Sequence, residues 1–293
     1  MNKIGIYYAY WVQDWDADFV PFVEKAAKLG FDILEVNSGT VTNMSNKERD
    51  RLKNAAKANN IDLTYCIGLT REYDVASEIK EVRLNGIAFL KKQAEMLKYM
   101  GAEKLGGIIY SSWPGTLPDG VTDKRPFFDR SVASMKEVIK TVEDCGVEFN
   151  IEVVNRFEQY LINTCDEALE YIDAVGSRNL KILLDTFHMN IEEDSFSDAI
   201  KKAGHKLGHF HLGETNRRAP GQGRMPWDEI FRALNGINYT GTISMEPFVI
   251  PGGEVGRDIH VFRDLRSKTE DLDAGAKKAL DFVREKIRLF VSL

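Results

Sequence analysis

Eight apolar runs of strand length alternate with stretches of helical spacing along this chain, and this alternation constrains the fold more than any other feature. The runs are Ile4–Tyr10, Phe31–Val36, Leu63–Leu69, Lys104–Tyr110, Glu148–Val154, Leu180–Asp185, Leu207–Leu212 and Thr242–Glu246. Gly30, Gly101 and Gly146 each stand just before a strand, where glycines that end helices are common. Eight such units predict one α/β domain, a (β/α)8 barrel spanning residues 1–293. A doubly wound open sheet is the alternative, but no glycine-rich phosphate turn follows the first strand.

The barrel prediction also indicates which loops matter. In such barrels the active site lies at the carboxyl ends of the strands, in the loops that lead into the helices. Three of these loops are long, namely Ser111–Phe127, Gly213–Pro226 and Pro247–Asp271, and the last helix is expected at Ala274–Phe290. Long connections in a compact domain are usually functional, so we expect them to wall the site. For the distal half of the third loop, packing or a contact between subunits is an equal alternative.

The charge balance and the cysteine count limit the cellular role. The chain has 39 Lys and Arg against 45 Asp and Glu residues, so it lacks the basic excess that engages nucleic-acid phosphates or anionic membranes. No apolar run is long enough to span a bilayer, and the first residues show no export signal. Three widely spaced cysteines are typical of free thiols. We expect a cytoplasmic protein without nucleic-acid or membrane partners.

Four apolar runs in the second half carry a metal-binding side chain at their carboxyl ends: Glu152, Asp185, His211 and Glu246. If these strands are neighbours in one barrel, the four side chains converge at one mouth. A single buried carboxylate is more often satisfied by an arginine or a backbone turn. Four in succession favour a metal site instead, and three carboxylates with one imidazole suit Mn²⁺ or Mg²⁺.

Further polar and aromatic side chains lie near the same ends and indicate the class of ligand. The polar ones are Asn155, Arg156, Glu158, His188 and Arg217, and the aromatic ones are Tyr7, Trp15, Trp113 and Phe248. Such a mixture suits a small polyhydroxylated ligand, because hydroxyls need donors and acceptors while C–H faces need apolar surface. Ordinary packing is an open alternative for each aromatic residue, and it is about equal for Trp15, Trp113 and His188.

Five longer strings carry a family resemblance. They are Val154-Asn-Arg-Phe-Glu158, Asp185-Thr-Phe-His-Met-Asn-Ile-Glu-Glu193, His209-Phe-His-Leu-Gly-Glu214, Pro220-Gly-Gln-Gly-Arg224 and Met245-Glu-Pro-Phe248. They resemble the ketose 3-epimerases, a group of xylose-isomerase-like TIM barrels that includes the D-tagatose 3-epimerases and the D-psicose (D-allulose) 3-epimerases. The resemblance extends from the first strand to the final helix. Two segments, Cys66-Ile-Gly-Leu69 and Asp123-Lys-Arg-Pro126, look more like the D-tagatose branch.

The resemblance implies a role for each matching residue. It implies that Glu152, Asp185, His211 and Glu246 hold one divalent metal per subunit, most often Mn²⁺, with Co²⁺ or Mg²⁺ as substitutes and no organic cofactor. Glu152 and Glu246 also form the acid–base pair. The hydroxyls and carbonyl around C1 and C2 are bound by Glu158, His188 and Arg217, and the pocket is shaped by Tyr7, Trp15, Cys66, Trp113 and Phe248. A homodimer or homotetramer is implied as well.

The implied reaction is C3 epimerisation of free ketohexoses, pairing D-tagatose with D-sorbose and D-fructose with D-psicose, by proton abstraction and return through an enediolate. An aldose–ketose isomerase on the same scaffold is the nearest alternative, since it also needs a metal and a carboxylate base. A multi-zinc nuclease is disfavoured because the chain has only five histidines, none in its first half. A non-catalytic sugar-binding barrel is a third reading. Phosphorylated substrates stay open because Arg217, Arg218 and Arg224 share one loop.

Overall fold

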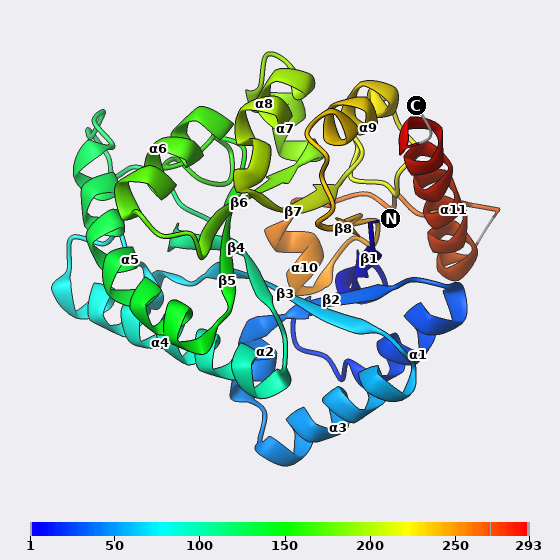
Figure 1. Ribbon diagram of the computed structural model, residues 1–293, viewed down its shortest axis with the longest axis horizontal. Helices are drawn as coiled ribbons and strands as arrows, with labels where there is room; N and C mark the ends of the chain where they lie inside the picture. The colour runs from blue at the N-terminus through cyan, green and yellow to red at the C-terminus, as the bar shows by residue number, and fades with distance from the viewer. Residues whose placement is uncertain (1, 270, 292–293) are drawn as a thin grey trace.

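The computed structural model describes residues 2–269 and 271–291, and its centre is a closed barrel of parallel strands (Figure 1). The strands are β1 (Ile4–Tyr7), β2 (Ile33–Asn37), β3 (Asp62–Leu69), β4 (Lys104–Ser112), β5 (Glu148–Val153), β6 (Leu180–Asp185), β7 (Leu207–Leu212) and β8 (Thr242–Met245). Each strand pairs with the next in sequence, and β1 pairs in parallel with β8, which closes the sheet. The predicted (β/α)8 barrel is therefore confirmed, and the open doubly wound sheet is excluded.

The helices mostly surround the barrel as an outer ring, and the short one after β8 lies over the barrel itself in the view of Figure 1. They are α1 (Val20–Leu29), α2 (Ser38–Asn43), α3 (Asn46–Ala58), α4 (Lys80–Met100), α5 (Arg125–Cys145), α6 (Cys165–Val175), α7 (Thr186–Glu192), α8 (Phe196–Ala203), α9 (Trp227–Gly236), α10 (Gly253–Asp258) and α11 (Leu272–Val291), with 3-10 turns η1 (Tyr8–Tyr10), η2 (Arg71–Tyr73) and η3 (Gly204–Lys206). Gly30, Gly101 and Gly146 end α1, α4 and α5 with φ of 91°, 70° and 69°. These left-handed angles favour glycine, so the predicted helix ends are confirmed.

The first strand is shorter than predicted. The apolar run from Ile4 continues to Tyr10, but the strand ends at Tyr7 and the next three residues form η1. Tyr8 packs edge-on against Phe19 with ring centroids 4.8 Å apart, and its hydroxyl donates to the carbonyl of Trp15. The end of the apolar run is thus buried by aromatic packing under the following loop. In the sequence, residues buried in this way have the same apolar pattern as a strand.

Two of the three long loops contain more regular structure than predicted. β4 extends to Ser112 and α5 begins at Arg125, while the segment after β8 contains α10. The loop between β7 and α9 is held from inside by the buried carboxylate of Glu214. It accepts hydrogen bonds from the backbone N–H of Gly221 at 2.8 Å and from the indole of Trp227 at 2.8 Å. A loop fastened in this way presents a fixed wall.

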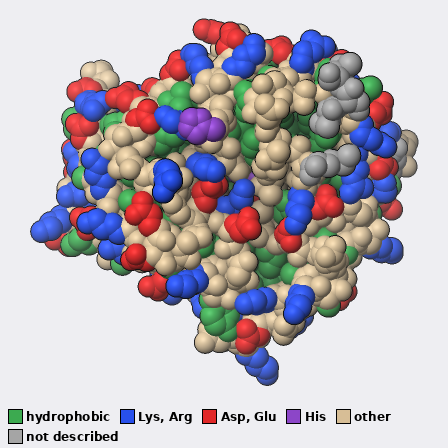
Figure 2. All heavy atoms as spheres, in the orientation of Figure 1, with side chains coloured by type: hydrophobic (Ala, Val, Ile, Leu, Met, Phe, Trp, Pro, Cys, Tyr) green, Lys and Arg blue, Asp and Glu red, His purple; other side chains and the backbone are tan. Residues whose placement is uncertain are grey.

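Acidic and basic side chains are interspersed over the face of the molecule seen in Figure 2. This distribution agrees with the near balance of charges in the sequence. Within residues 2–269 and 271–291, no helix has the length and apolar character needed to cross a membrane. The three cysteines are free thiols, and Cys66 is buried on β3.

Candidate metal centre and active site

The four predicted metal-binding side chains meet at the carboxyl end of the barrel. Glu152 lies on β5, Asp185 ends β6, His211 lies on β7, and Glu246 follows β8 directly. One ligand atom from each lies within 4.8 Å of the other three, and all four residues are buried. Because the strands are parallel and in register, with Asp185 opposite His211, their carboxyl ends deliver these side chains to one place. We call this group the mouth cluster.

Two atoms of the mouth cluster are buried without a hydrogen-bond partner among the described residues: Asp185 Oδ2 and His211 Nδ1. His211 Nδ1 lies 3.7 Å from Glu152 Oε1 and 3.6 Å from Glu246 Oε1. Buried polar atoms are almost always satisfied, and a lone pair left bare costs about 1–3 kcal/mol. A divalent cation among three carboxylates and an imidazole would satisfy them all, so these residues fit a metal ion.

Electrostatics in the mouth cluster favour positive charge. The pKa of Glu246 is raised well above its usual value by burial and by the neighbouring carboxylates Glu152 and Asp185, which outweigh the opposing effect of His211. Burial lowers the pKa of His211, but the neighbouring carboxylates Glu35 and Glu246 raise it by more than burial lowers it. The pKa of His211 therefore lies well above the usual range. Glu246 and His211 therefore bind protons more readily than usual at the position that a cation would occupy.

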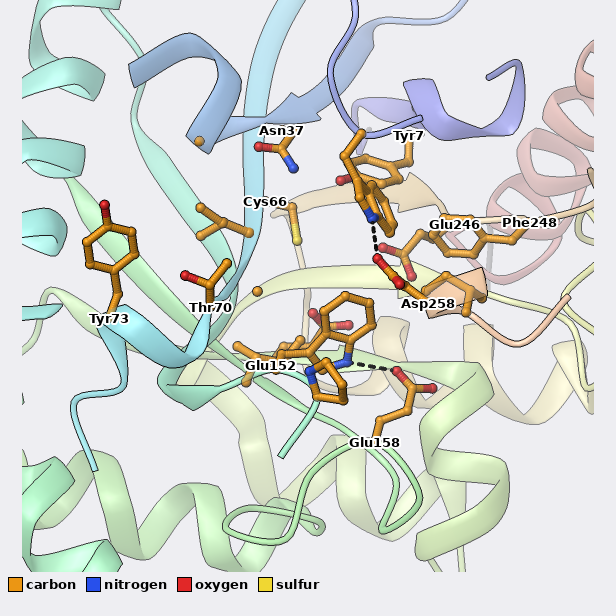
Figure 3. Close-up of a pocket in the computed structure, with 18 of the residues that line it drawn as sticks. Tyr7, Asn37, Cys66, Thr70, Tyr73, Glu152, Glu158, Glu246, Phe248 and Asp258 are labelled. Atoms are coloured by element: carbon orange, nitrogen blue, oxygen red, sulfur yellow. Dashed lines mark hydrogen bonds between the residues drawn. The ribbon is translucent and has the colours of Figure 1, made fainter. Parts of the chain in front are cut away.

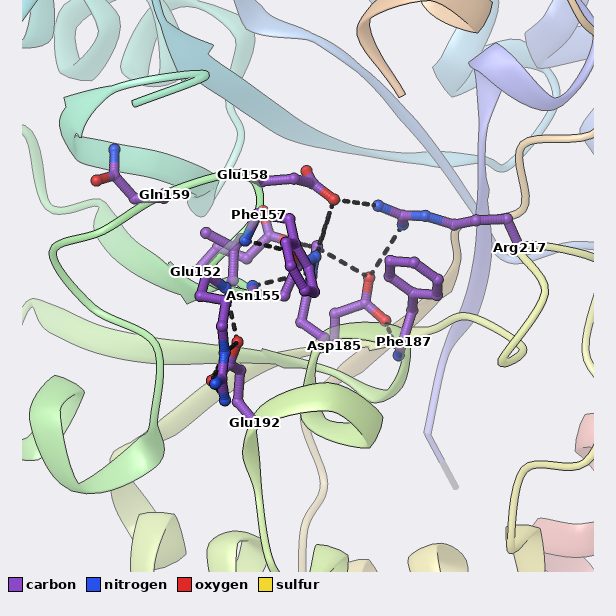
Figure 4. A network of polar contacts seen from close by, with 12 residues as sticks. Glu152, Asn155, Phe157, Glu158, Gln159, Asp185, Phe187, Glu192 and Arg217 are labelled. Atoms are coloured by element: carbon purple, nitrogen blue, oxygen red, sulfur yellow. Dashed lines mark hydrogen bonds and ion pairs between the residues drawn. The ribbon is translucent and has the colours of Figure 1, made fainter. Parts of the chain in front are cut away.

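Glu158, His188 and Arg217 lie together beside the mouth cluster, and both His188 and Arg217 are within ion-pair distance of Glu158. Figure 4 shows Glu158 and Arg217 facing each other. The Arg217 guanidinium donates to Glu158 Oε1 at 3.1 Å, and its centre lies 3.7 Å from the centroid of the Phe187 ring. His188 Nδ1 accepts the backbone N–H of Asn155 at 3.2 Å, which leaves Nε2 to carry the hydrogen toward Glu152 and Asp185, each 3.9 Å away. These three predicted binding residues thus form one surface next to the mouth cluster.

Aromatic side chains wall a cavity of about 420 Å³ above the mouth cluster (Figure 3). Tyr7, Trp15, Trp113 and Phe248 all line it, with the rings of Trp15 and Trp113 6.1 Å apart and those of Tyr7 and Phe248 6.0 Å apart. The Trp113 indole donates to Glu158 Oε2 at 3.1 Å. Cys66 lines the same cavity. Trp15 and Trp113 thus line the cavity and also pack against the core, and their contact with a ligand stays a prediction.

One sequence expectation does not hold at this site. Arg156 was grouped with the polar residues near the metal, but its side chain is exposed and forms a bidentate pair with Glu192 at 2.7 Å. Asn155 Oδ1 accepts the backbone N–H of Phe157 in a turn at this point, and Glu158 lines the cavity whereas Arg156 does not.

Sequence reasoning also missed residues of the cavity. Further lining residues are Asn37, Ile67, Thr70, Tyr73, Phe89 and Asp258. Asp258 reaches the site from the end of α10 and accepts the Trp15 indole N–H at 2.9 Å. Asn37 ends β2 and Ile67 lies on β3, whereas Thr70, Tyr73, Phe89 and Asp258 come from a turn and from helices, where the spacing of strand residues gives no signal.

Glu35 on β2 was missed as well, although the sequence held a signal. It is a lone carboxylate between Leu34 and Val36 in an apolar run, the same pattern that identified Glu152. It is fully buried, and both His209 and His211 donate to it through Nε2 at 2.7 Å. Burial raises the pKa of Glu35, but the two histidines outweigh this and hold it well below the usual value.

The fold and the site together define a class: a parallel eight-stranded barrel with a carboxylate–histidine metal site at its mouth. Residues 23–286 match the family described as xylose isomerase-like TIM barrel. A D-psicose 3-epimerase of Ruminiclostridium cellulolyticum is 46% identical over 96% of this chain and 97% of its own length, and one of Agrobacterium fabrum is 45% identical over 96% and 98%. The chain belongs to the ketose 3-epimerase family of xylose isomerase-like TIM barrels.

Solved structures give the same placement. A crystal structure of D-psicose 3-epimerase with D-tagatose from Clostridium cellulolyticum H10 superposes with a TM-score of 0.94 over 97% of this chain and 99% of that chain, at 46% identity. A ketose 3-epimerase of Arthrobacter globiformis is 30% identical over 97% of this chain and 96% of its own length. The two segments around Cys66 and Asp123 suggested the D-tagatose branch, whereas three relatives at 43–46% identity bear the name D-psicose 3-epimerase. The comparisons therefore favour the D-psicose side of the family.

Proposed function

We propose that this protein is a metal-dependent ketose 3-epimerase that inverts C3 of free ketohexoses, pairing D-fructose with D-psicose and D-tagatose with D-sorbose. One observation carries the proposal: two buried glutamates, Glu152 and Glu246, approach the same atom, His211 Nδ1, from strands on either side of β7. The names of the relatives support the substrate class, and two similar crystal structures were determined with D-tagatose and in the presence of D-fructose.

The mouth cluster would hold one divalent ion per subunit through Glu152, Asp185, His211 and Glu246. Oxygen donors with one imidazole favour Mn²⁺, with Co²⁺ or Mg²⁺ as substitutes. When bound, the ion would supply Lewis-acid polarisation of the ketose carbonyl, which makes the neighbouring C–H more acidic. No organic cofactor is needed, because no electron or group leaves the sugar.

Glu152 and Glu246 would move the proton. Inversion at C3 requires that one carboxylate take the proton from one face of the carbon and that the other, as a carboxylic acid, deliver a proton to the opposite face. The two groups exchange protonation states during one turnover, and exchange with water restores them. The raised pKa of Glu246 in the metal-free protein agrees with one partner of the pair holding a proton.

Neighbouring side chains would orient the sugar. Glu158, His188 and Arg217 present an acceptor, an N–H and a guanidinium beside the mouth cluster, which suits the hydroxyl and carbonyl around C1 and C2. The walls are Tyr7, Trp15, Cys66, Trp113 and Phe248, and they offer apolar surface to the C–H faces and exclude water from the reacting carbon.

Hydrogen exchange at named carbons tests this function. Protein loaded with Mn²⁺ is incubated in D₂O with D-fructose, and the sugars are analysed by NMR. We expect deuterium at C3 together with D-psicose. Deuterium at C1 together with an aldose product would show an aldose–ketose isomerase instead of an epimerase. Binding of the sugar without exchange at either carbon would indicate a non-catalytic sugar-binding barrel.

We also infer one domain over residues 1–293 and a homodimer or homotetramer. Phe157 and Phe262 support the oligomer, since these large apolar side chains are 73% and 78% exposed in loops at the carboxyl end of the barrel. Light scattering coupled to size-exclusion chromatography measures the mass directly. A monomer at micromolar concentration would contradict this inference and leave the reaction proposal intact.

A further inference from the structure

We infer that Glu35 is a positioning residue of the metal centre: its carboxylate fixes the Nε2–H of His211 and so reserves His211 Nδ1 as the ligand atom. This inference rests on the metal site of the proposed function. It adds a residue that supplies none of the four mouth-cluster ligands and lies on β2, which β8 and β1 separate from β7 around the barrel.

Glu35 is fully buried, and its two oxygens have different partners. Oε2 accepts three hydrogen bonds, from Thr64 Oγ1 at 2.6 Å, His209 Nε2 at 2.7 Å and Ser244 Oγ at 2.9 Å. Oε1 accepts one, from His211 Nε2 at 2.7 Å. Among the described residues its ion pairs are those with the two histidines, without a lysine or arginine. One carboxylate oxygen is thus dedicated to the metal-ligand histidine.

The bond to Oε1 determines which nitrogen of His211 can bind a metal. A carboxylate is an acceptor only, so the hydrogen of this 2.7 Å contact resides on Nε2. A neutral imidazole carries one N–H, and its lone pair then lies on Nδ1. Nδ1 is the buried atom without a partner that faces Glu152 and Glu246. Carboxylate partners of this kind fix the tautomer and ring orientation of metal-bound histidines.

An amide at position 35 would lose this property while keeping its size. Two imidazole N–H groups converge on Glu35, one on each oxygen. In Glu35→Gln the amide nitrogen must face one of them, and a donor then opposes a donor. With the amide nitrogen toward His211, the ring must give up this hydrogen bond or change its tautomer. With the amide nitrogen toward His209, a neutral amide oxygen replaces the carboxylate that accepts from His211 Nε2, and this weaker acceptor holds the ring less firmly. We expect Mn²⁺ to bind about 10- to 100-fold more weakly.

The experiment measures Mn²⁺ dissociation constants by calorimetry and by electron paramagnetic resonance for the wild type, Glu35→Gln and Ser244→Ala. Ser244→Ala is the matched control, because it removes a hydrogen bond to Oε2 and leaves the bond between Oε1 and His211. We expect weaker binding in Glu35→Gln, an unchanged constant in Ser244→Ala, and recovery of C3 exchange in Glu35→Gln at high Mn²⁺. Equal affinity in wild type and Glu35→Gln, or an equal loss in both variants, would overturn the inference.

A second measurement uses the wild-type protein, so it holds even where Glu35→Gln fails to fold. Histidine-selective ¹⁵N NMR with Mg²⁺ as a diamagnetic ion reports the tautomer of each ring. We expect His211 to carry its hydrogen on Nε2, and a hydrogen on Nδ1 or a metal-bound Nε2 would refute the positioning role. The two proposals are separable: absence of Mn²⁺ binding by the wild type removes the proposed function itself, whereas normal binding with an unaffected Glu35→Gln removes only the inference about Glu35.

Discussion

Two buried clusters of carboxylate and imidazole groups among the described residues, one at the mouth of the barrel and one deeper, differ in whether their hydrogen bonds are complete. In the deeper cluster, which we call the inner cluster, Glu35 accepts four hydrogen bonds from Thr64, His209, His211 and Ser244. In the mouth cluster, Asp185 Oδ2 and His211 Nδ1 are buried without partners in the described part of the chain. His211 belongs to both, with one nitrogen in each.

This difference indicates that carboxylate and imidazole side chains have a structural role in the inner cluster and a ligand-binding role in the mouth cluster. A buried carboxylate with all its partners stabilises one arrangement of the core, because each donor offsets part of its desolvation. A buried cluster with bare lone pairs and neighbouring like charges costs stability and persists where a ligand supplies the missing charge. Burial or composition alone would not distinguish the clusters, whereas the count of satisfied atoms does.

The largest effect is expected from the two glutamates of the mouth cluster. Glu152→Gln and Glu246→Gln each remove a proton-transfer group, and kcat for C3 epimerisation should fall about 100- to 10,000-fold. Glu72→Gln is the control, since Glu72 is an exposed residue at the far end of the same cavity and should retain near wild-type activity. Near-normal kcat in either mouth variant, measured with saturating Mn²⁺, would deny that glutamate its role.

Metal binding at the mouth should depend on pH. In the metal-free protein the pKa values of His211 and Glu246 are both raised, so both groups bind protons more readily than usual. These protons must leave when a cation enters, so Mn²⁺ affinity should fall as pH falls through the raised pKa values, about tenfold per pH unit for each proton released. Calorimetric titration at several pH values measures this. An affinity independent of pH between about 6 and about 8 would contradict the proton competition.

Removing a charge from the mouth cluster should stabilise the metal-free protein. In Asp185→Asn one of three crowded carboxylates becomes neutral, while Oδ1 can still cap the N–H of Phe187. We expect unfolding free energy to rise by about 1–2 kcal/mol and Mn²⁺ binding to be lost. Denaturant unfolding in the presence of a chelator gives the first quantity. A less stable metal-free variant would show that the mouth cluster is not under electrostatic strain.

The inner cluster should respond in the opposite direction and to a smaller extent. Thr64→Val removes the 2.6 Å hydrogen bond to Glu35 Oε2 with little change of shape. The unfolding free energy should fall by about 1 kcal/mol, with Mn²⁺ affinity unchanged. The same denaturant series measures it. If Thr64→Val left stability untouched, or changed metal affinity as much as Glu35→Gln, the two clusters would not be functionally distinct.

Much of the fold and of the metal site could be predicted from the residue pattern of single strands. The alternation of apolar runs predicted the barrel, and the ligand side chains at the ends of four runs predicted the mouth cluster, because parallel neighbours bring equivalent ends together. The resemblance then pointed to Glu158, His188 and Arg217. The error at Tyr8–Tyr10 has the same origin: aromatic residues buried under a loop have the pattern of a strand.

What the sequence determined by itself was the set of residues whose positions follow from local periodicity: the strands, their carboxyl ends and the four side chains that face the mouth. Only the tertiary structure decided the partners across the barrel interior. β2 and β7 are not adjacent, so no spacing predicts that Glu35 lies 2.7 Å from His211. The same holds for Asp258, which α10 brings to the indole of Trp15. The physical reason is that periodicity along a strand determines which face of the sheet a side chain occupies, whereas closure of the barrel determines which residues from other strands that side chain contacts.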